Sequence, residues 1–467
     1  MTQAVVGRAS AGSTEGEARA SRSTLLKQLL LLALPVLAEH VLHILVGLND
    51  TYLANHLPTH RPEAAAAVGT IQYIFWFIGL FAGAIGTGST AIIARASGAK
   101  HRRRANSACG QSVLFGLFTG LALALFLFLF ASPVANFTSL QGIAHDYALD
   151  YLRMLSPSIP FLVIMFIANA CLRGAGDTLT PAISMIVVDI FNIFFSWSLT
   201  FGWFGFAKLG FTGIAVGTVI AYIAGGLLQL IVLIVGRGGI KLHIHRLRPH
   251  WYDMKRILNI GLPNAGESLI NWFANFCLVK IVNRTTPVNV AAAAHNNAIR
   301  IESISYMTGF AFSVAVATMV GQSLGMKDPR RAQRSAYLGY LIGGGFMTLA
   351  GLFFIFFSKY PAAVLAGEPN IRDLTAKCLH VTGFCQIGFA AAIIFGGALR
   401  GAGDTYSVMM ISLVSVLLLR LGGVAVVGGY LHQPLPIIWI VLATDLFFRG
   451  VLIYSRFLQG GWKKIQV

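Results

Sequence analysis

The first long apolar segment of the chain carries acidic and histidine side chains that are costly to place in hydrocarbon. Glu39, His43 and Asp50 are spaced at i, i+4 and i+11, which places them on one face of a helix. Ionisable groups within a membrane mark ion or proton pathways by default. Because histidine titrates near neutrality, this face would suit a proton relay. The alternative is that Glu39 and His43 only pair with each other while Asp50 lies near the outer water.

A second set of polar residues occurs in two long segments of the other half of the chain. Glu267, Asn271 and Asn275 are four residues apart and share a helix face, and His295 and Arg300 lie in the next segment. These side chains could form one wall of a substrate cavity. They could equally hold neighbouring helices together through hydrogen bonds. The spacing leaves both interpretations open.

The elements that carry these residues must be membrane-spanning helices. The 467-residue chain has a mean hydropathy of +0.71 and only 11% charged residues, whereas soluble domains have about a quarter. The apolar runs are continuous rather than alternating, which favours helices over a β-barrel. We therefore expect an all-α membrane protein with twelve transmembrane helices, near residues 29–52, 64–90, 108–131, 146–170, 179–201, 211–235, 257–282, 288–320, 336–358, 375–399, 406–428 and 436–458.

The formal charge of +18 is explained by basic loops on one side of the membrane. By the positive-inside rule this side is cytoplasmic, which places both termini inside the cell and the protein in the inner (plasma) membrane. No soluble basic domain is long enough for nucleic-acid binding. Residues 1–24 are expected to be a disordered cytoplasmic tail. The five cysteines show no CxxC spacing, so no disulfide or metal role is predicted.

The chain contains an internal duplication. The heptapeptide LRGAGDT occurs at 172–178 and again at 399–405, and Gly98 matches Gly325 at the same offset. A repeat of this length predicts two structural copies. Six spans in each copy keep the same orientation, so the two lobes should be related by a pseudo-two-fold axis along the membrane normal. The predicted N-lobe covers residues 25–235, the C-lobe covers 257–467, and a cytoplasmic linker, 236–256, joins them.

The repeated heptapeptide predicts a tight reversal between two helices. Its glycines permit positive φ angles, and its Asp and Thr can accept backbone N–H bonds at the start of the next helix. Arg173 and Arg400 are expected to anchor at the phosphate layer. Elsewhere, GTGSTA at 86–91 resembles a nucleotide-binding loop, but no strand precedes it, so we expect close helix packing.

These landmarks resemble the multidrug and toxic compound extrusion (MATE) family. Four further stretches carry the resemblance: LNDTYLANHL (48–57), GTGSTAIIARASGAK (86–100), NNAIRIESISYMTGFAFSVA (296–315) and VATMVGQSLGMKDPRRA (316–332). The resemblance implies V-shaped lobes, alternating access and antiport: bulky, often cationic or lipophilic compounds leave in exchange for H⁺ or Na⁺. It implies a monomeric transporter that needs small-molecule substrates and a lipid bilayer but no cofactor. The alternatives are a lipid-linked oligosaccharide flippase, which would need a strongly cationic cavity, and a membrane-embedded enzyme.

The same resemblance implies a cation-coupling site in the N-lobe. Asp50, Asn192 and Thr218 fall at positions that build this site in the family. The second span-5 position is Ser196 rather than an acid, which weakens a Na⁺ site because Na⁺ prefers several hard oxygen ligands. Asp189, one turn earlier, could compensate. We therefore expect coupling to H⁺ rather than Na⁺.

Overall fold

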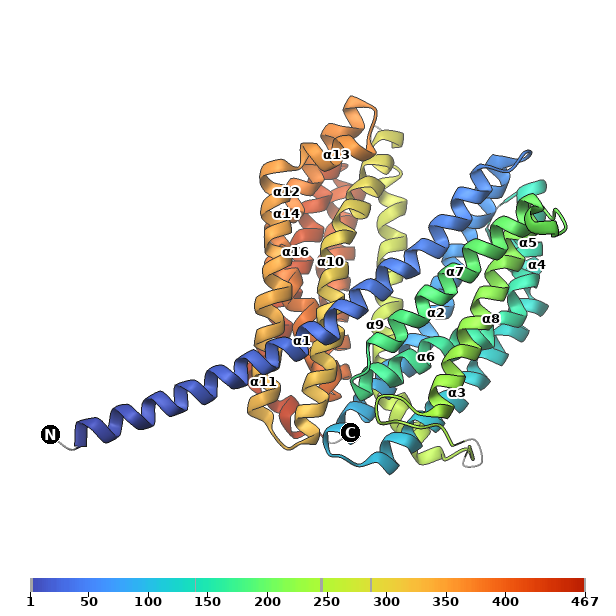
Figure 1. The fold of residues 1–467 in the computed structure, drawn as a ribbon. Coiled ribbons are helices and arrows are strands. Elements are labelled where there is room, and N and C mark those ends of the chain that lie inside the picture. Colours follow the sequence, from blue (N-terminus) through green and yellow to red (C-terminus); the bar gives the residue numbers. More distant parts are fainter. Residues whose placement is uncertain (1–2, 139, 244–246, 286–287, 466–467) are drawn as a thin grey trace.

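The computed structural model describes residues 3–138, 140–243, 247–285 and 288–465, and this part of the chain is helical (Figure 1). The first half comprises α1 (Gln3–Asn55), α2 (Arg61–Gly98), α3 (Arg102–Leu129), α4 (Ala131–Phe137), α5 (Ile143–Leu155), α6 (Ile159–Ala175), α7 (Leu179–Phe201) and α8 (Phe211–Val235). The second half comprises α9 (Trp251–Val282), α10 (Val288–Gly325), α11 (Pro329–Gly339), α12 (Gly345–Phe357), α13 (Lys359–Leu365), α14 (Pro369–Ala402), α15 (Thr405–Ser415) and α16 (Leu435–Gln459).

The predicted all-α membrane fold is confirmed. In the described residues, 11 helical segments are long and apolar enough to cross a membrane. The remaining predicted span is α9, whose apolar character is interrupted by Asn264, Glu267 and Asn271. Three spans are built from more than one element: α5 continues into α6, α11 into α12, and α15 into two π-helical segments, Val416–Gly422 and Ala425–Tyr430.

Two boundaries differ from the sequence prediction. α1 begins at Gln3, so residues 3–24, which lie in the segment expected to be a disordered tail (1–24), are part of this helix. Residues 3–24 include five Ala and three Arg residues, which are good helix formers. The linker is also shorter than predicted, because α9 already begins at Trp251.

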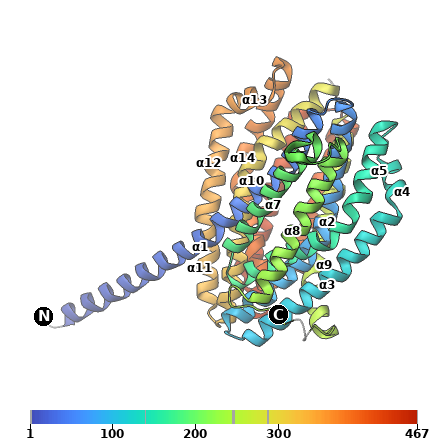
Figure 2. The same cartoon turned by 45° about the vertical axis from the view of Figure 1, so that its right-hand side comes forward.

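The two halves of the chain form two lobes, which we call the N-lobe (α1–α8) and the C-lobe (α9–α16). In Figure 1 the lobes converge at the end of the molecule where the C-terminus lies and separate toward the opposite end. After a turn of 45° about the vertical axis the two lobes overlap in projection (Figure 2). The short helices α4 and α13 follow the third span of each half and begin 228 residues apart, at Ala131 and Lys359. This matching element supports the duplication seen in the sequence.

The hydrophobic core of each lobe includes residues from the first helix of the other lobe, across the predicted lobe boundaries. Leu25, Leu29 and Leu32, in the first part of α1, pack into the hydrophobic core of the C-lobe. In the reciprocal position, Ile257 and Ile260 of α9 pack into the core of the N-lobe. Each lobe therefore uses the beginning of the other lobe's first helix to cover its own apolar surface.

Glycines allow the lobes to touch through their backbones at the convergent end. A Cβ atom on Gly98 of α2 would overlap the carbonyl oxygen of Gln322 in α10. A Cβ atom on Gly325 of α10 would in turn overlap the carbonyl oxygen of Arg95 in α2. The two contacts are equivalent under the internal repeat. The lobes can pack this closely because neither crossing point carries a side chain.

The repeated LRGAGDT segments form the predicted tight reversals. Gly176 and Gly403 adopt positive φ angles of 97° and 91° directly after α6 and α14. In the first copy the Asp177 carboxylate accepts a hydrogen bond from the backbone N–H of Thr180 at 3.0 Å, at the start of α7. These turns fix the ends of the fourth and fifth spans in each lobe.

The arginines of these turns do not anchor at the membrane surface as predicted. Arg173 donates to both carboxylate oxygens of Glu39, at 2.8 and 2.9 Å. Arg400 does the same to Glu267, at 2.9 and 2.7 Å. All four side chains are largely buried, with 11–21% of their surface exposed. In each lobe a buried carboxylate binds the guanidinium through charge-assisted hydrogen bonds. These bonds replace the ones that lipid headgroups were expected to supply.

The glycine contact between α2 and α10 leads to a first prediction. We expect Gly98→Ala to destabilise the convergent end of the lobes by roughly 1–3 kcal/mol, because overpacking a tight contact forces the backbones apart. The midpoint of thermal unfolding in detergent should fall. The distance between spin labels at the exposed Arg103 and Arg330 should increase. Gly79→Ala, on the same helix but with open space around its Cβ, is the matched control. Equal midpoints for the two variants would contradict the expectation.

A double-mutant cycle tests the ion pair between α9 and α14. Arg400→Gln should destabilise the protein by roughly 3 kcal/mol, because it leaves the buried Glu267 carboxylate without its cation. The double variant Glu267→Gln/Arg400→Gln should be less destabilised than the sum of the single changes, by about 0.5–3 kcal/mol. Unfolding midpoints of the four proteins measure this coupling. Strictly additive losses would show that the pair contributes no coupling.

Candidate functional site

The first candidate site is a cluster of polar side chains around Asp50 in the N-lobe. Asp50 lies in α1 and is fully buried, with 1% of its surface exposed. Its carboxylate accepts hydrogen bonds from the Tyr151 hydroxyl of α5 at 3.0 Å and the Thr218 hydroxyl of α8 at 2.9 Å. The Asn192 amide of α7 donates at 3.3 Å. We call these four residues, with Ser196, the Asp50 cluster.

Asn192 joins the members of the Asp50 cluster to one another. Its amide nitrogen also lies 2.9 Å from the Thr218 hydroxyl and 3.4 Å from the Ser196 hydroxyl. An amide nitrogen has two hydrogens, so it cannot donate fully to three acceptors at once. A change in the charge of Asp50 can therefore redistribute these bonds among helices α1, α7 and α8.

Sequence reasoning placed Asp50, Asn192, Ser196 and Thr218 together, and the structure brings all four into contact. It missed two neighbours. Tyr151 was not identified because it follows an amphipathic, partly polar segment that carries no motif. Asn49 bridges the Asn192 carbonyl, 2.8 Å away, and the Trp197 indole N–H, 2.9 Å away. The signal for Asn49 was present in the sequence, since it directly precedes Asp50.

Asp189 was also predicted to belong to this site, and in the described residues no hydrogen bond joins it to the Asp50 cluster. It lies on α7 and is buried, with 5% of its surface exposed. Among the described residues neither of its carboxylate oxygens has a hydrogen-bond partner. Its membership of the cation-coupling site stays a prediction.

The predicted relay through Glu39 and His43 is not assembled either. Besides Arg173, Glu39 accepts a hydrogen bond from the Asn169 amide at 3.0 Å. His43 is exposed, and its ring packs edge-on against Phe166 with centroids 5.5 Å apart. The i, i+4 spacing was correct for one face, but the arginine of the neighbouring turn is a stronger partner for a carboxylate than a neutral imidazole.

The second candidate site is a cavity of about 690 Å³ between the lobes. Its walls come from α2 and α6 of the N-lobe and from α9, α10, α14 and α16 of the C-lobe. Four of the five predicted cavity residues line it: Glu267, Asn271, Asn275 and His295. Arg300 does not, because it is exposed on another face of α10. Glu302 faces the cavity, and residues two positions apart on a helix point in different directions. Arg300 therefore points away from the cavity.

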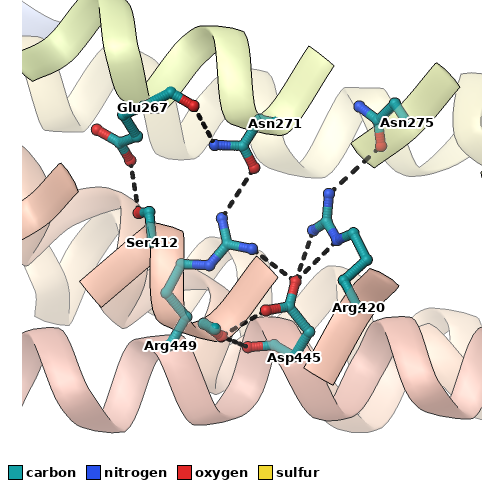
Figure 3. A network of polar contacts seen from close by, with 8 residues as sticks. Glu267, Asn271, Asn275, Ser412, Arg420, Asp445 and Arg449 are labelled. Atoms are coloured by element: carbon teal, nitrogen blue, oxygen red, sulfur yellow. Dashed lines mark hydrogen bonds and ion pairs between the residues drawn. The ribbon is translucent and has the colours of Figure 1, made fainter. Parts of the chain in front are cut away.

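Arginine side chains line the cavity in a way that the sequence analysis did not predict. Arg173, Arg400, Arg420 and Arg449 all contribute to its surface. Arg420 and Arg449 both bind the carboxylate of Asp445, a residue of α16 with no exposed surface (Figure 3). The Asp445 carboxylate also accepts from the Ser415 hydroxyl.

The asparagines of α9 orient this Arg–Asp–Arg triad (Arg420, Asp445, Arg449). The Asn271 side-chain oxygen lies 3.1 Å from Arg449, and the Asn275 side-chain oxygen lies 3.3 Å from Arg420 (Figure 3). Arg420 is carried by a π-helical turn, Val416–Gly422, a backbone form that is frequent at functional sites. Because this turn is not visible in hydrophobic periodicity, sequence reasoning could not place Arg420 on the cavity face.

Comparisons with known proteins agree with the architecture. The sequence model of the MatE family matches residues 35–198 and 263–424. The "Probable multidrug resistance protein NorM" of Thermotoga maritima is 31% identical over 444 residues, which cover 94% of this chain and 93% of that protein.

Two solved structures share the fold. One is described as "MATE in the bent conformation"; it has a TM-score of 0.86 and 19% identity, and the match covers 95% of this chain and 98% of that one. The other is a Pyrococcus furiosus MOP superfamily transporter for which "reverse polarity of binding pocket suggests different function", with a TM-score of 0.84, 19% identity, and coverage of 94% and 97%.

The repeat, the two lobes and the match of both halves to one family model lead to the same assignment. The predicted resemblance is confirmed: this chain belongs to the MatE family of multidrug efflux transporters and is a multi-pass membrane protein.

Proposed function

We propose that this protein is a secondary active antiporter of the inner membrane, that it exports bulky lipophilic compounds in exchange for protons, and that Asp50 carries the proton. The observation behind this proposal is the isolation of the Asp50 carboxylate. All its hydrogen-bond donors are neutral groups: a phenol, an alcohol and an amide. Among the described residues no ion pair reaches Asp50, whereas Glu39, Glu267 and Asp445 each have an arginine partner. Asp189 and Glu302 also lie outside these ion pairs, but the Asp50 carboxylate differs from theirs in joining donors from three other helices, α5, α7 and α8. A buried charge without a counter-ion is costly within a membrane, and binding a proton removes that cost.

The same cluster favours H⁺ over Na⁺ as the coupling ion. A Na⁺ site needs several free oxygen ligands. In the Asp50 cluster the Asn192 carbonyl oxygen already accepts from Asn49, and the Thr218 hydroxyl oxygen already accepts from the Asn192 amide. Ser196 offers only a hydroxyl where a second acid would suit a metal cation. These engaged oxygens support a site that exchanges protons rather than one that coordinates Na⁺.

Protonation of Asp50 would link the ion to the shape of the N-lobe. A neutral carboxylic acid accepts hydrogen bonds more weakly than a carboxylate and adds a donor of its own. The Tyr151 and Thr218 hydroxyls come from α5 and α8, and Asn192 comes from α7. Their bonds to Asp50 must rearrange when the proton binds. Because these helices end at the separated side of the lobes, the rearrangement can shift the equilibrium between cavity states.

We further propose that the convergent end of the lobes faces the cytoplasm. The basic turns around Arg103 and Arg330, the LRGAGDT turns and the C-terminus all lie at this end (Figure 1). The positive-inside rule supports this orientation. In this orientation the lobes separate toward the cell exterior, and the interlobe cavity can release its contents on that side of the membrane.

A lipid-linked oligosaccharide flippase is a second candidate, and one observation favours it. The arginines that line the cavity are a feature that such a flippase would need. The Pyrococcus furiosus transporter, described as having a pocket of reverse polarity, indicates that pocket charge differs among proteins of this fold. The charge of the substrate is therefore independent of the choice of coupling ion.

Transport into everted membrane vesicles tests the coupling. We expect wild-type vesicles with an acidic lumen to accumulate lipophilic dyes, tested with a panel that contains both anions and cations. They should show no response to an imposed Na⁺ gradient. Asp50→Asn should lower ΔpH-driven accumulation to the level of vesicles without the protein, because the amide cannot bind and release the proton. Asp150→Asn, an exposed acid in the same lobe, is the matched control and should transport normally. Full activity of Asp50→Asn, or a response to Na⁺ alone, would disprove the assignment.

A further inference from the structure

We propose that the interlobe cavity takes an organic anion, with a carboxylate or phosphate group attached to an aromatic or apolar body. The geometry points to Arg420 and Arg449 as the residues that hold the charged group. This inference rests on the transport function proposed above and specifies its substrate class. It differs from the cationic substrates that the family resemblance implies.

The side chains that line the cavity carry more positive than negative charge. Four arginines line it, against two glutamates, Glu267 and Glu302. Two further acids that balance these arginines, Glu39 and Asp445, do not line the cavity. Asp445 has no exposed surface, whereas 9% of each side chain of Arg420 and Arg449 is exposed. The guanidiniums therefore face the cavity, and the carboxylate that they share lies behind them.

The cavity wall formed by α9 and the Arg–Asp–Arg triad offers mainly hydrogen-bond donors. The side-chain oxygens of Asn271 and Asn275 already accept from Arg449 and Arg420. The Nε atom of Arg449 has no acceptor within the described part of the chain. Each guanidinium carries five N–H groups in a fork that matches carboxylate and phosphate oxygens. An oxyanion can supply the acceptors that this wall lacks.

The two carboxylates that a cationic substrate could bind in the cavity, Glu267 and Glu302, already accept hydrogen bonds. Both oxygens of Glu267 accept from Arg400, and one also accepts from the Ser412 hydroxyl at 2.9 Å. Glu302 accepts from Thr382 at 2.6 Å and Gln386 at 3.2 Å through a single oxygen. A cation would find one partly engaged glutamate in a cavity that four arginines line. Electrostatic repulsion from those arginines would oppose its binding.

The remaining walls suit the body of such a compound. Trp76 and Phe166 of the N-lobe face the cavity, as do Tyr306, Phe389 and Trp439 of the C-lobe. Trp76 also stacks on Trp272 of α9, with ring centroids 6.2 Å apart. Aromatic walls beside a few convergent polar groups are typical of small-molecule sites. Together the two surfaces fit an amphipathic anion with a ring system.

Two dyes with one ring system and opposite charge test the inference. Carboxyfluorescein is an anion and rhodamine 6G a cation, and both contain a xanthene core. We expect the protein in nanodiscs to bind carboxyfluorescein, measured by fluorescence anisotropy, and to bind rhodamine 6G at least tenfold more weakly. Arg449→Gln should weaken carboxyfluorescein binding about tenfold or more, because it removes a charge-assisted hydrogen bond. Arg300→Gln removes the same charge from an exposed position outside the cavity and should have no effect.

A compensated variant separates charge from folding. Arg449→Gln/Asp445→Asn removes one positive and one negative charge, so the triad keeps its net charge and no acid is left uncompensated. We expect this variant to fold as the wild type does and still to bind carboxyfluorescein as weakly as Arg449→Gln, because the guanidinium that binds the anion is missing from both. Asp50→Asn should retain carboxyfluorescein binding even though it loses coupled transport. This difference distinguishes a failure of the substrate assignment from a failure of the coupling assignment.

Each outcome of these binding experiments either supports the proposal or overturns it. Preferential binding of rhodamine 6G would overturn the proposal. So would equal carboxyfluorescein affinities for Arg449→Gln and Arg300→Gln. If the anion binds, proteoliposomes then distinguish its source. Accumulation of carboxyfluorescein under ΔpH supports a soluble organic anion. Movement of fluorescent NBD-phosphatidic acid between leaflets, read by dithionite quenching, supports a lipid with an anionic headgroup.

Discussion

Each lobe is organised around a carboxylate on its first helix and an arginine at the end of its fourth span. The pairs Glu39–Arg173 and Glu267–Arg400 occupy equivalent positions in the internal repeat. An ion pair this deep in a membrane protein is tolerated only when its geometry is good and its remaining atoms are satisfied. The LRGAGDT turn supplies that geometry, because glycine in a positive-φ conformation ends the helix just beyond the arginine. The two helices of each pair are thereby fixed relative to each other.

With those pairs formed, buried acids held by an arginine can be distinguished from Asp50, Asp189 and Glu302, which lie outside the ion pairs of the described residues. Glu39, Glu267 and Asp445 have arginine partners and serve to position helices. Asp50 has only neutral donors, so its charge state can change without breaking an ion pair. A transporter needs both kinds of acid. Fixed charges give the cavity a constant shape, and an isolated acid allows an ion gradient to act on that shape.

Much of this could be predicted from the sequence. Hydropathy and the repeat gave the helical class, the spans and the two lobes, because lipid exposure and duplication leave periodic signals. The Asp50 cluster was located through the family resemblance, which fixed Asn192, Ser196 and Thr218. The partners of Glu39 and the position of Arg420 could not be predicted. They depend on which helices lie side by side and on a π-helical turn, and neither is encoded in the spacing within one helix.

The exchange of helix starts between the lobes has a consequence for how the protein is assembled. Leu29 of α1 completes the C-lobe, and Ile257 of α9 completes the N-lobe. Each half, expressed as a separate polypeptide, would lose these packing contacts, so the two halves should be more stable together than apart. The arrangement has the form of a domain-swapped homodimer whose protomers became joined in one chain.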